Sequence, residues 1–470
     1  MCLSLIFLLC DTCFDEISYF SSIIFCAFSI WCCFSWYRAT DSYFDLYLLM
    51  LISTILFNGG HFFIKLFNPF KPVILVGYSP LCGHFHNSIM IETMVMVLWG
   101  ISAMHLGALW ISYTNSKLKI KYSPAIVKDK RRDFWYISPN ALKTAGYLLL
   151  VIAALPAFLW IGACVKIALS GGYKALFLAE IGYGSSIRIL MTLLIPSIFL
   201  LLIGSRDDRK TRLLSVGLIL LYSSAFFITG DRSKAIMPLL AYLWIWHIGI
   251  QKLSQKFFIV AGSFLLLVVL PIVQLVRAFE GYSGISFDTL IDILRQIENP
   301  AKFMLMTMGN SMGAIAHTIH LVPSVHNFGF GETYLRGIST IFPNLFWLEH
   351  PGSNFMGGDW FLWHVSPASV FSSRRGLGYS IIAEAYYNFG MFGVPFIMLL
   401  WGASVAKLTV WAQKGRYLSK IAFAGCFGAF IMQIPRGWIA YAFRPLVWYA
   451  FIPLVLARII YNWQKQNISS

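Results

Sequence analysis

The sequence is poor in charge, and in acidic residues above all. Only 12% of its 470 residues are charged and 58% are hydrophobic, whereas soluble globular domains carry about 25% charged residues. This shortage excludes an ordinary soluble domain and indicates an all-α polytopic membrane protein. The net charge of +16 would suggest nucleic acid only if a polar basic domain held it. None is present, so we attribute the charge to membrane topology and expect no nucleic-acid partner.

Several sequence signals are also missing. There is no nucleotide-binding loop, Rossmann glycine pattern or low-complexity tail, so we expect no cofactor. The apolar opening Cys2–Cys10 lacks a basic front and does not resemble a cleavable signal. Six of the nine cysteines fall within the first 33 residues without a paired metal spacing, which favours packing over disulfides or metal ligation.

Apolar runs are what the sequence has in abundance. They predict eleven membrane helices, and a twelfth if Cys2–Cys10 enters the bilayer. The chain should therefore consist of about eight helices within residues 1–276, a soluble loop over residues 277–378, and about three helices within residues 379–470. The predicted helices lie near residues 17–37, 43–64, 87–113, 144–169, 187–204, 213–229, 235–250, 257–276, 379–405, 421–435 and 444–461.

Lysine and arginine in short loops set the orientation, because such loops resist translocation. The stretch from Thr114 to Lys143 holds eight of them and should be cytoplasmic. Counting crossings places the other basic clusters on the same side, and places Asp231, the 277–378 loop and Arg436 on the opposite face. In the inner membrane of a bacterium that face is the periplasm.

The hexapeptide Thr229-Gly230-Asp231-Arg232-Ser233-Lys234 separates two apolar runs that are each about one bilayer thick. A charge at the centre of a membrane helix costs about 2.5 to 3.5 kcal/mol. We therefore expect a helical hairpin whose tip lies at head-group depth. Asp231, Arg232 and Lys234 could bind a lipid's polar head there, or could simply be solvated.

Three more arginines should reach the same surface. Arg277 follows a predicted membrane helix, and Arg374 and Arg375 precede another. The planar guanidinium binds phosphate oxygens in pairs, so such a cluster suits a diphosphate, with scattered lipid anchoring as the alternative. Glu280 lies one helical turn after Arg277. A membrane-surface helix is expected over Ala301–Leu321; it carries His317 and His320 but offers no third metal ligand.

Two further stretches carry a pattern. Gly331-Glu332-Thr333-Tyr334-Leu335-Arg336 predicts a polar turn before an aromatic segment. The later stretch Ala383-Glu384-Ala385-Tyr386-Tyr387-Asn388-Phe389-Gly390 sets Glu384 and Asn388 four residues apart, on one face of a membrane helix. An ionisable residue within such a helix is a functional candidate, with a structural hydrogen bond to a neighbouring tyrosine as the alternative.

These two motifs, together with Gly230-Asp231-Arg232 and the large loop late in the chain, resemble the Wzy-type O-antigen or oligosaccharide repeat-unit polymerases. The resemblance extends over roughly residues 140–460. It implies a metal-independent membrane glycosyltransferase that acts on oligosaccharide units carried by undecaprenyl diphosphate. The growing glycan would pass from its own lipid to an incoming lipid-linked unit. A chain-length regulator and a flippase are the protein partners that it suggests, beside membrane lipids.

The residues suit this chemistry. Arginines at head-group depth could neutralise a departing diphosphate without a metal, and Glu280, or otherwise His317 or His320, could accept the hydroxyl proton. A ligase that moves finished glycan to another acceptor would use the same arginines, and a flippase would need no large external segment. The candidate catalytic residues are Arg232, Arg277, Glu280 and Glu384, and the candidate substrate-binding residues are Asp231, Lys234, Arg336, Arg374, Arg375 and Asn388.

Overall fold

A computed structural model describes residues 14–67, 85–114, 134–179, 185–276, 299–342, 357–365, 378–414 and 417–469. Within these ranges the ordered elements are helices, and no β-strand is found. Eleven helical segments of the described ranges are long and apolar enough to cross a membrane, which confirms the predicted all-α polytopic architecture. Residues 2–10, the potential twelfth helix, lie outside the described ranges.

The chain folds into two compact units that both draw on distant segments. The three-part division at residues 276 and 378 concerns position relative to a membrane and stays a prediction. Unit 1 comprises Met1–Leu118, Asn299–Lys407 and Met432–Phe443. Its helices are α2 (Phe14–Thr40), α3 (Leu46–Phe67), α4 (Asn87–Thr114), α13 (Pro300–Met308), α14 (Ser311–Leu321), α15 (Glu332–Ser339), α16 (Gly357–Val365) and most of α18 (Ile381–Lys414).

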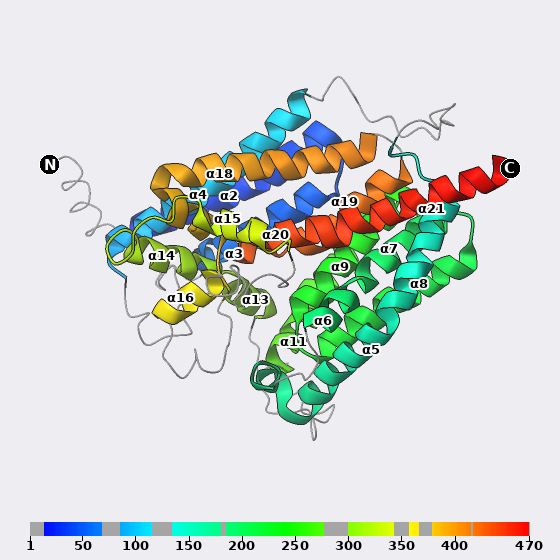
Figure 1. The fold of residues 1–470 in the computed structure, drawn as a ribbon. Coiled ribbons are helices and arrows are strands. Elements are labelled where there is room, and N and C mark those ends of the chain that lie inside the picture. The colour runs from blue at the N-terminus through cyan, green and yellow to red at the C-terminus, as the bar shows by residue number, and fades with distance from the viewer. Residues whose placement is uncertain are drawn as a thin grey trace. The chain divides into compact units, whose positions relative to one another are not determined.

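Helix α3 is the centre of unit 1, where it packs against α2, α4, α13 and α14. Helices α4 and α18 run side by side (Figure 1) and approach closely at glycines. A Cβ atom at Gly107 would lie 2.2 Å from the carbonyl oxygen of Leu399, and one at Gly402 would lie 1.9 Å from that of Met104. Small residues therefore permit this crossing, as is common between membrane helices.

Unit 2 comprises Lys119–Glu298, Leu408–Ile431 and Arg444–Ser470. Helix α5 packs against α6, α7 and α21, while α9 packs against α8 and α19. Asp208 caps α8 and forms a 3.1 Å ion pair with Lys143 of α5. The helices that begin in this unit are α5 (Pro139–Leu178), α6 (Ser185–Thr192), α7 (Leu194–Gly204), α8 (Arg209–Ile228), α9 (Arg232–Ile245), α10 (Gln255–Phe264), α11 (Leu270–Val276), α19 (Leu418–Ile431) and α21 (Ile452–Ser469). Helix α20 (Ala440–Pro445) follows α19 in the chain and extends from one unit into the other.

The predicted hairpin around Gly230 is confirmed, since α8 ends at Ile228, α9 begins at Arg232 and the two helices pack together. Gly230 has φ +78°, a left-handed conformation that favours glycine. Two other local predictions are wrong. The 301–321 segment forms two helices, α13 and α14, with a break at Gly309 and Asn310, and the expected polar turn after Gly331 is the short helix α15.

Helix α14 also differs from the membrane-surface helix that its weakly apolar sequence suggested. Its residues from Ser311 to Ile319 are buried, because α3, α4 and α16 pack around it. Neither α13 nor α14 is long enough to count among the eleven candidate spans. The segment is therefore an internal support of unit 1.

Candidate functional site

Backbone hydrogen bonds join the segment before α15 to the first half of α18. Gly329 N–H donates to the carbonyl oxygen of Tyr387 at 2.9 Å, and Phe330 N–H donates to that of Asn388 at 3.0 Å. These carbonyls are available because α18 is interrupted at Gly390, which has φ +65° and non-helical geometry. An ordinary helix would use them internally. The two motifs that the sequence singled out are thus parts of one assembly.

Glu384 lies at the centre of this assembly and is fully buried. Its Oε1 accepts a 2.8 Å hydrogen bond from the Thr333 hydroxyl of α15, and its Oε2 accepts a 2.7 Å bond from the backbone N–H of Ile439. The alternative partners suggested by the sequence are Tyr386 and Tyr387, and the Tyr386 hydroxyl donates instead to Glu92 of α4 at 3.1 Å. Both oxygens of Glu384 therefore tie α18 to other segments of unit 1.

Asn388 completes the network from the same face of α18. Its amide group donates to Thr333 Oγ1 and to the Glu384 carbonyl, both at 2.8 Å, while its Oδ1 accepts from Gly331 N–H at 2.9 Å. Gly331 has φ +91°, a conformation that a side chain would strain. Glu384 and Asn388 have no exposed surface. They therefore hold α15 in place rather than face a solvent-filled cavity.

Arg336 lies at the surface of the same assembly. Its Nε donates a 2.9 Å hydrogen bond to Glu332 Oε1, one helical turn earlier on α15. Both side chains are more than a third exposed, at 35% for Arg336 and 40% for Glu332. A pair this exposed contributes little to stability, so a substrate could compete for either group.

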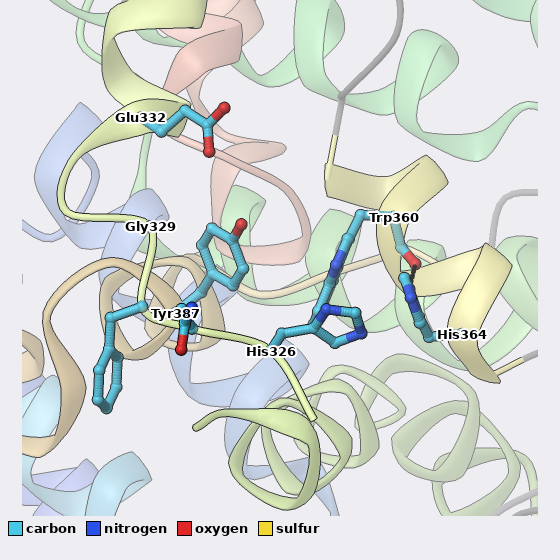
Figure 2. A pocket seen from close by; sticks show the side chains of 8 residues that line it. His326, Gly329, Glu332, Trp360, His364 and Tyr387 are labelled. Carbon is cyan, nitrogen blue, oxygen red and sulfur yellow. Dashed lines mark hydrogen bonds between the residues drawn. The ribbon is translucent and has the colours of Figure 1, made fainter. Parts of the chain in front are cut away.

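A pocket of about 390 Å³ opens beside this network. Figure 2 shows His326 and Tyr387 on one side, with Trp360 and His364 of α16 pointing toward them from the other. The Trp360 and Tyr387 rings lie 5.1 Å apart between centroids, and those of His326 and His364 lie 4.2 Å apart. The residues labelled along its wall are His326, Gly329, Glu332, Trp360, His364 and Tyr387.

The hairpin residues belong to unit 2. Asp231 caps α9 through a 3.2 Å bond from Lys234 N–H and pairs with Lys234 Nζ at 2.6 Å. These contacts give Asp231 and Lys234 a structural role at the helix start. Arg232 is the first residue of α9 and is half-buried.

The histidines that we considered as bases have different surroundings. His317 is buried on α14 against the rings of Phe85 and Phe361, and burial, together with His320, lowers its pKa to about 4. His320 is exposed at the end of the same helix. Arg277, Glu280, Arg374 and Arg375 lie outside the described residues, so the cluster of four arginines stays a prediction.

Sequence reasoning missed His326, Trp360, His364 and Arg436 as parts of this region. Trp360 and His364 lie four residues apart on α16, but His326 comes from another segment and no spacing rule links it to them. Arg436 lies in the turn before α20, where its carbonyl accepts from Tyr379 N–H at 3.1 Å. A Cβ atom at Gly378 would lie 2.8 Å from its Nε. The one sequence signal for Arg436 was its predicted position on the same membrane face as the 277–378 loop.

Comparisons with known proteins agree with the family that the motifs resemble. The family described as O-antigen polysaccharide polymerase Wzy matches residues 1–467. Protein CapE of Staphylococcus aureus is 24% identical over 202 residues, which are 43% of this chain and 41% of that protein. The chain thus aligns with less than half of this relative's length. No solved structure matches the chain.

Proposed function

Because the chain belongs to the O-antigen polysaccharide polymerase Wzy family, we propose that it joins lipid-linked oligosaccharide repeat units into a surface polysaccharide, an O-antigen or a capsule. The family match over almost the whole chain is the observation that carries this proposal. The substrate would be an oligosaccharide on undecaprenyl diphosphate, held in the inner membrane with its sugars in the periplasm. A flippase would supply it, and a chain-length regulator would control the product.

The reaction that we propose transfers the growing glycan from its lipid to an acceptor hydroxyl. The acceptor oxygen forms a bond to the first sugar carbon of the glycan, and the bond from that carbon to the diphosphate oxygen breaks. The diphosphate leaves with the bonding electron pair, and the hydroxyl proton passes to a base. Arginine guanidinium groups at head-group depth can neutralise the leaving group in place of a metal ion.

Within each unit, hydrogen bonds join segments that the predicted topology puts at the same face of the membrane. Elements expected at the periplasmic end of unit 1 do meet. The Ser380 hydroxyl donates to Asn58 Oδ1 at 2.6 Å, and the Asn58 amide donates to the Pro435 carbonyl at 3.1 Å. In unit 2, elements expected at the cytoplasmic end meet as well, since Arg458 donates to the carbonyl of Tyr136 at 2.8 Å. These contacts support our proposal that the Glu384 assembly and Arg436 lie at the periplasmic face.

Glu280, three residues after Arg277 in the sequence, is our candidate for the base. Glu280→Gln keeps the shape of the side chain and removes its basicity. We expect it to lower kcat at least about 100-fold, which is the lower end of what general-base catalysis contributes, with substrate binding near normal. Turnover at the parental rate by purified Glu280→Gln would move the base elsewhere.

The glycan profile of a deletion strain tests the proposed activity. If the chain is the polymerase, the acceptor lipid will carry one repeat unit where the parent shows a ladder of lengths. An acceptor lipid without any repeat unit would indicate the ligase or flippase function instead. Complementation with the intact chain should restore the ladder.

A further inference from the structure

The pocket beside α16 is lined by aromatic and histidine side chains that take no part in the hydrogen bonds around Glu384. Its buried base is formed by Trp360 and Tyr387, which are each 6% exposed. Aromatic carbon next to polar groups provides an apolar surface for the C–H face of a sugar ring and partners for its hydroxyls. The volume of about 390 Å³ is near the lower end of the range for small-ligand sites, which suits a single ring.

The hydrogen bond of His364 determines which of its nitrogens can face a ligand. Its Nδ1 lies 2.8 Å from the backbone carbonyl of Trp360 (Figure 2). A carbonyl oxygen only accepts, so Nδ1 carries the proton in this contact. In the neutral ring Nε2 is then the acceptor. Helix α16 thus provides an oriented hydrogen-bond acceptor at the pocket wall.

The His326 ring packs against the His364 ring at an interplanar angle of 76°, and one of its nitrogens is without a hydrogen-bond partner in the described residues. Its Nε2 is buried, and no hydrogen-bond partner for it is found in the part of the chain that the structure describes. Burial and the neighbouring His364 lower the pKa of His326, which favours the neutral ring. Buried polar atoms rarely lack a partner, and a sugar hydroxyl can both donate and accept.

The network around Glu384 fixes the opposite wall. Gly329 and Tyr387 line the pocket and are joined by the 2.9 Å backbone hydrogen bond described above. Since the Thr333 hydroxyl anchors α15 to Glu384, the position of Glu332 at the rim depends on this buried carboxylate. The α15 and α18 motifs therefore shape one wall of the pocket and contribute Tyr387 to it, whereas α16 contributes Trp360 and His364.

From this geometry we propose that the pocket is the subsite for one sugar ring of the repeat unit, packed on Trp360 and Tyr387 and hydrogen-bonded to His326 and His364. The proposal rests on the polymerase function proposed above, and it assigns these residues to substrate binding rather than to proton transfer. Because a uniform loss of substrate binding raises KM without lowering kcat, the assignment can be separated from a role in chemistry.

The test uses the full chain, purified in lipid nanodiscs, with His326→Leu, His364→Leu and the more conservative Trp360→Phe. His86→Leu is the matched control, since His86 is an exposed histidine of the same unit outside the pocket. The probe for binding is the repeat-unit oligosaccharide released from its lipid, followed by saturation-transfer NMR. Polymerisation of the intact lipid-linked unit gives kcat and KM. Only variants with the parental melting temperature are compared.

We expect each histidine variant to weaken oligosaccharide binding and raise KM about tenfold, which corresponds to the loss of one hydrogen bond of about 1.4 kcal/mol, with kcat within about twofold of the parent. Trp360→Phe should show a smaller rise and His86→Leu none. Parental KM in both histidine variants, or a parental protein that does not bind the oligosaccharide, would overturn the pocket assignment. Binding that depends on these histidines in a parental protein that forms no polymer would retain the pocket and refute the polymerase.

Discussion

At the scale of single residues, Glu384 joins three segments of unit 1. Its two oxygens accept from α15 and from the turn before α20, and it has no exposed surface. Two buried donors would lose their partner if the carboxylate were removed, at a cost of about 1 to 3 kcal/mol for each. We therefore regard Glu384 as a positioning residue.

Glu384→Gln should be a partial defect. The amide oxygen can still accept from Ile439 N–H, and the amide nitrogen can donate to Thr333 Oγ1, but the threonine hydroxyl then loses its acceptor. We expect polymerisation to continue at a reduced rate, with KM raised about three- to tenfold, whereas Glu384→Ala should abolish activity and lower abundance. Kinetics with purified lipid-linked units would measure both. A purely catalytic role for Glu384 would be indicated if Gln lowered kcat and left KM unchanged.

Arginine geometry gives a second prediction at this scale. Lysine keeps the charge at Arg232 or Arg277 but cannot bind two phosphate oxygens through a planar fork. Arg232→Lys and Arg277→Lys should each lower activity at least about tenfold, because one charge-assisted bond contributes about 1.5 kcal/mol or more. Membrane abundance should stay normal. Full activity in both variants would mean that these arginines only anchor the chain at the lipid surface.

Sequence periodicity predicts which residues lie on the same face when they belong to one helix. Glu384 and Asn388 lie on one face of α18, as their spacing predicts, because a helix repeats every 3.6 residues. Their partners Thr333 and Ile439 come from distant parts of the chain. No local pattern specifies that pairing, and the same limit applies to His326 and His364.

At the scale of elements, α14 shows why composition misleads about a helix's surroundings. Its sequence is weakly apolar, yet three helices enclose it. Tertiary packing decides such a case, since a short amphipathic segment satisfies either a membrane surface or a protein interior. The α18 interruption is likewise invisible to hydropathy, although Gly390 is the residue type that permits it.

Buried His317 makes the stability of unit 1 depend on pH. An unfolded histidine takes up a proton near pH 6.5, and the fold lowers the pKa of His317 to about 4. Between these values the unfolded chain binds more protons than the folded chain, so stability is full above about pH 6.5 and falls as pH drops toward 4. The total loss would be about 3 kcal/mol.

Unfolding midpoints of the purified chain from pH 7 to pH 4 would measure this dependence. We expect His317→Leu to remove most of the fall in the unfolding midpoint toward pH 4. His320→Leu changes an exposed ring and should retain most of that fall. An identical slope in the parent and in His317→Leu would show that His317 does not carry the effect.

At the scale of the whole molecule, the proposal depends on which face of the membrane carries the site. Hydropathy suffices to predict the eleven candidate spans found in the described residues, because bilayer thickness and the cost of charge are general. It does not specify how the helices gather into two units, since that depends on contacts such as the one between Gly402 and Met104.

Cysteine labelling in intact cells tests the predicted orientation. Ser233→Cys at the hairpin should react with a membrane-impermeant reagent from the periplasm, while Lys121→Cys should react only after lysis. A version of the chain without its native cysteines should first be shown to be active. Reaction of the Lys121 variant in intact cells, or protection of the Ser233 variant, would reverse the topology and remove the arginine argument.

The most direct measurement of the central claim is polymerisation by the purified chain alone. The chain in nanodiscs would be incubated with undecaprenyl-diphosphate-linked repeat units, without added metal or nucleotide sugar. We predict lipid-linked glycans that grow in steps of one repeat unit, with one free undecaprenyl diphosphate released per step. Unchanged single units, in a preparation that binds the same substrate, would contradict the polymerase assignment.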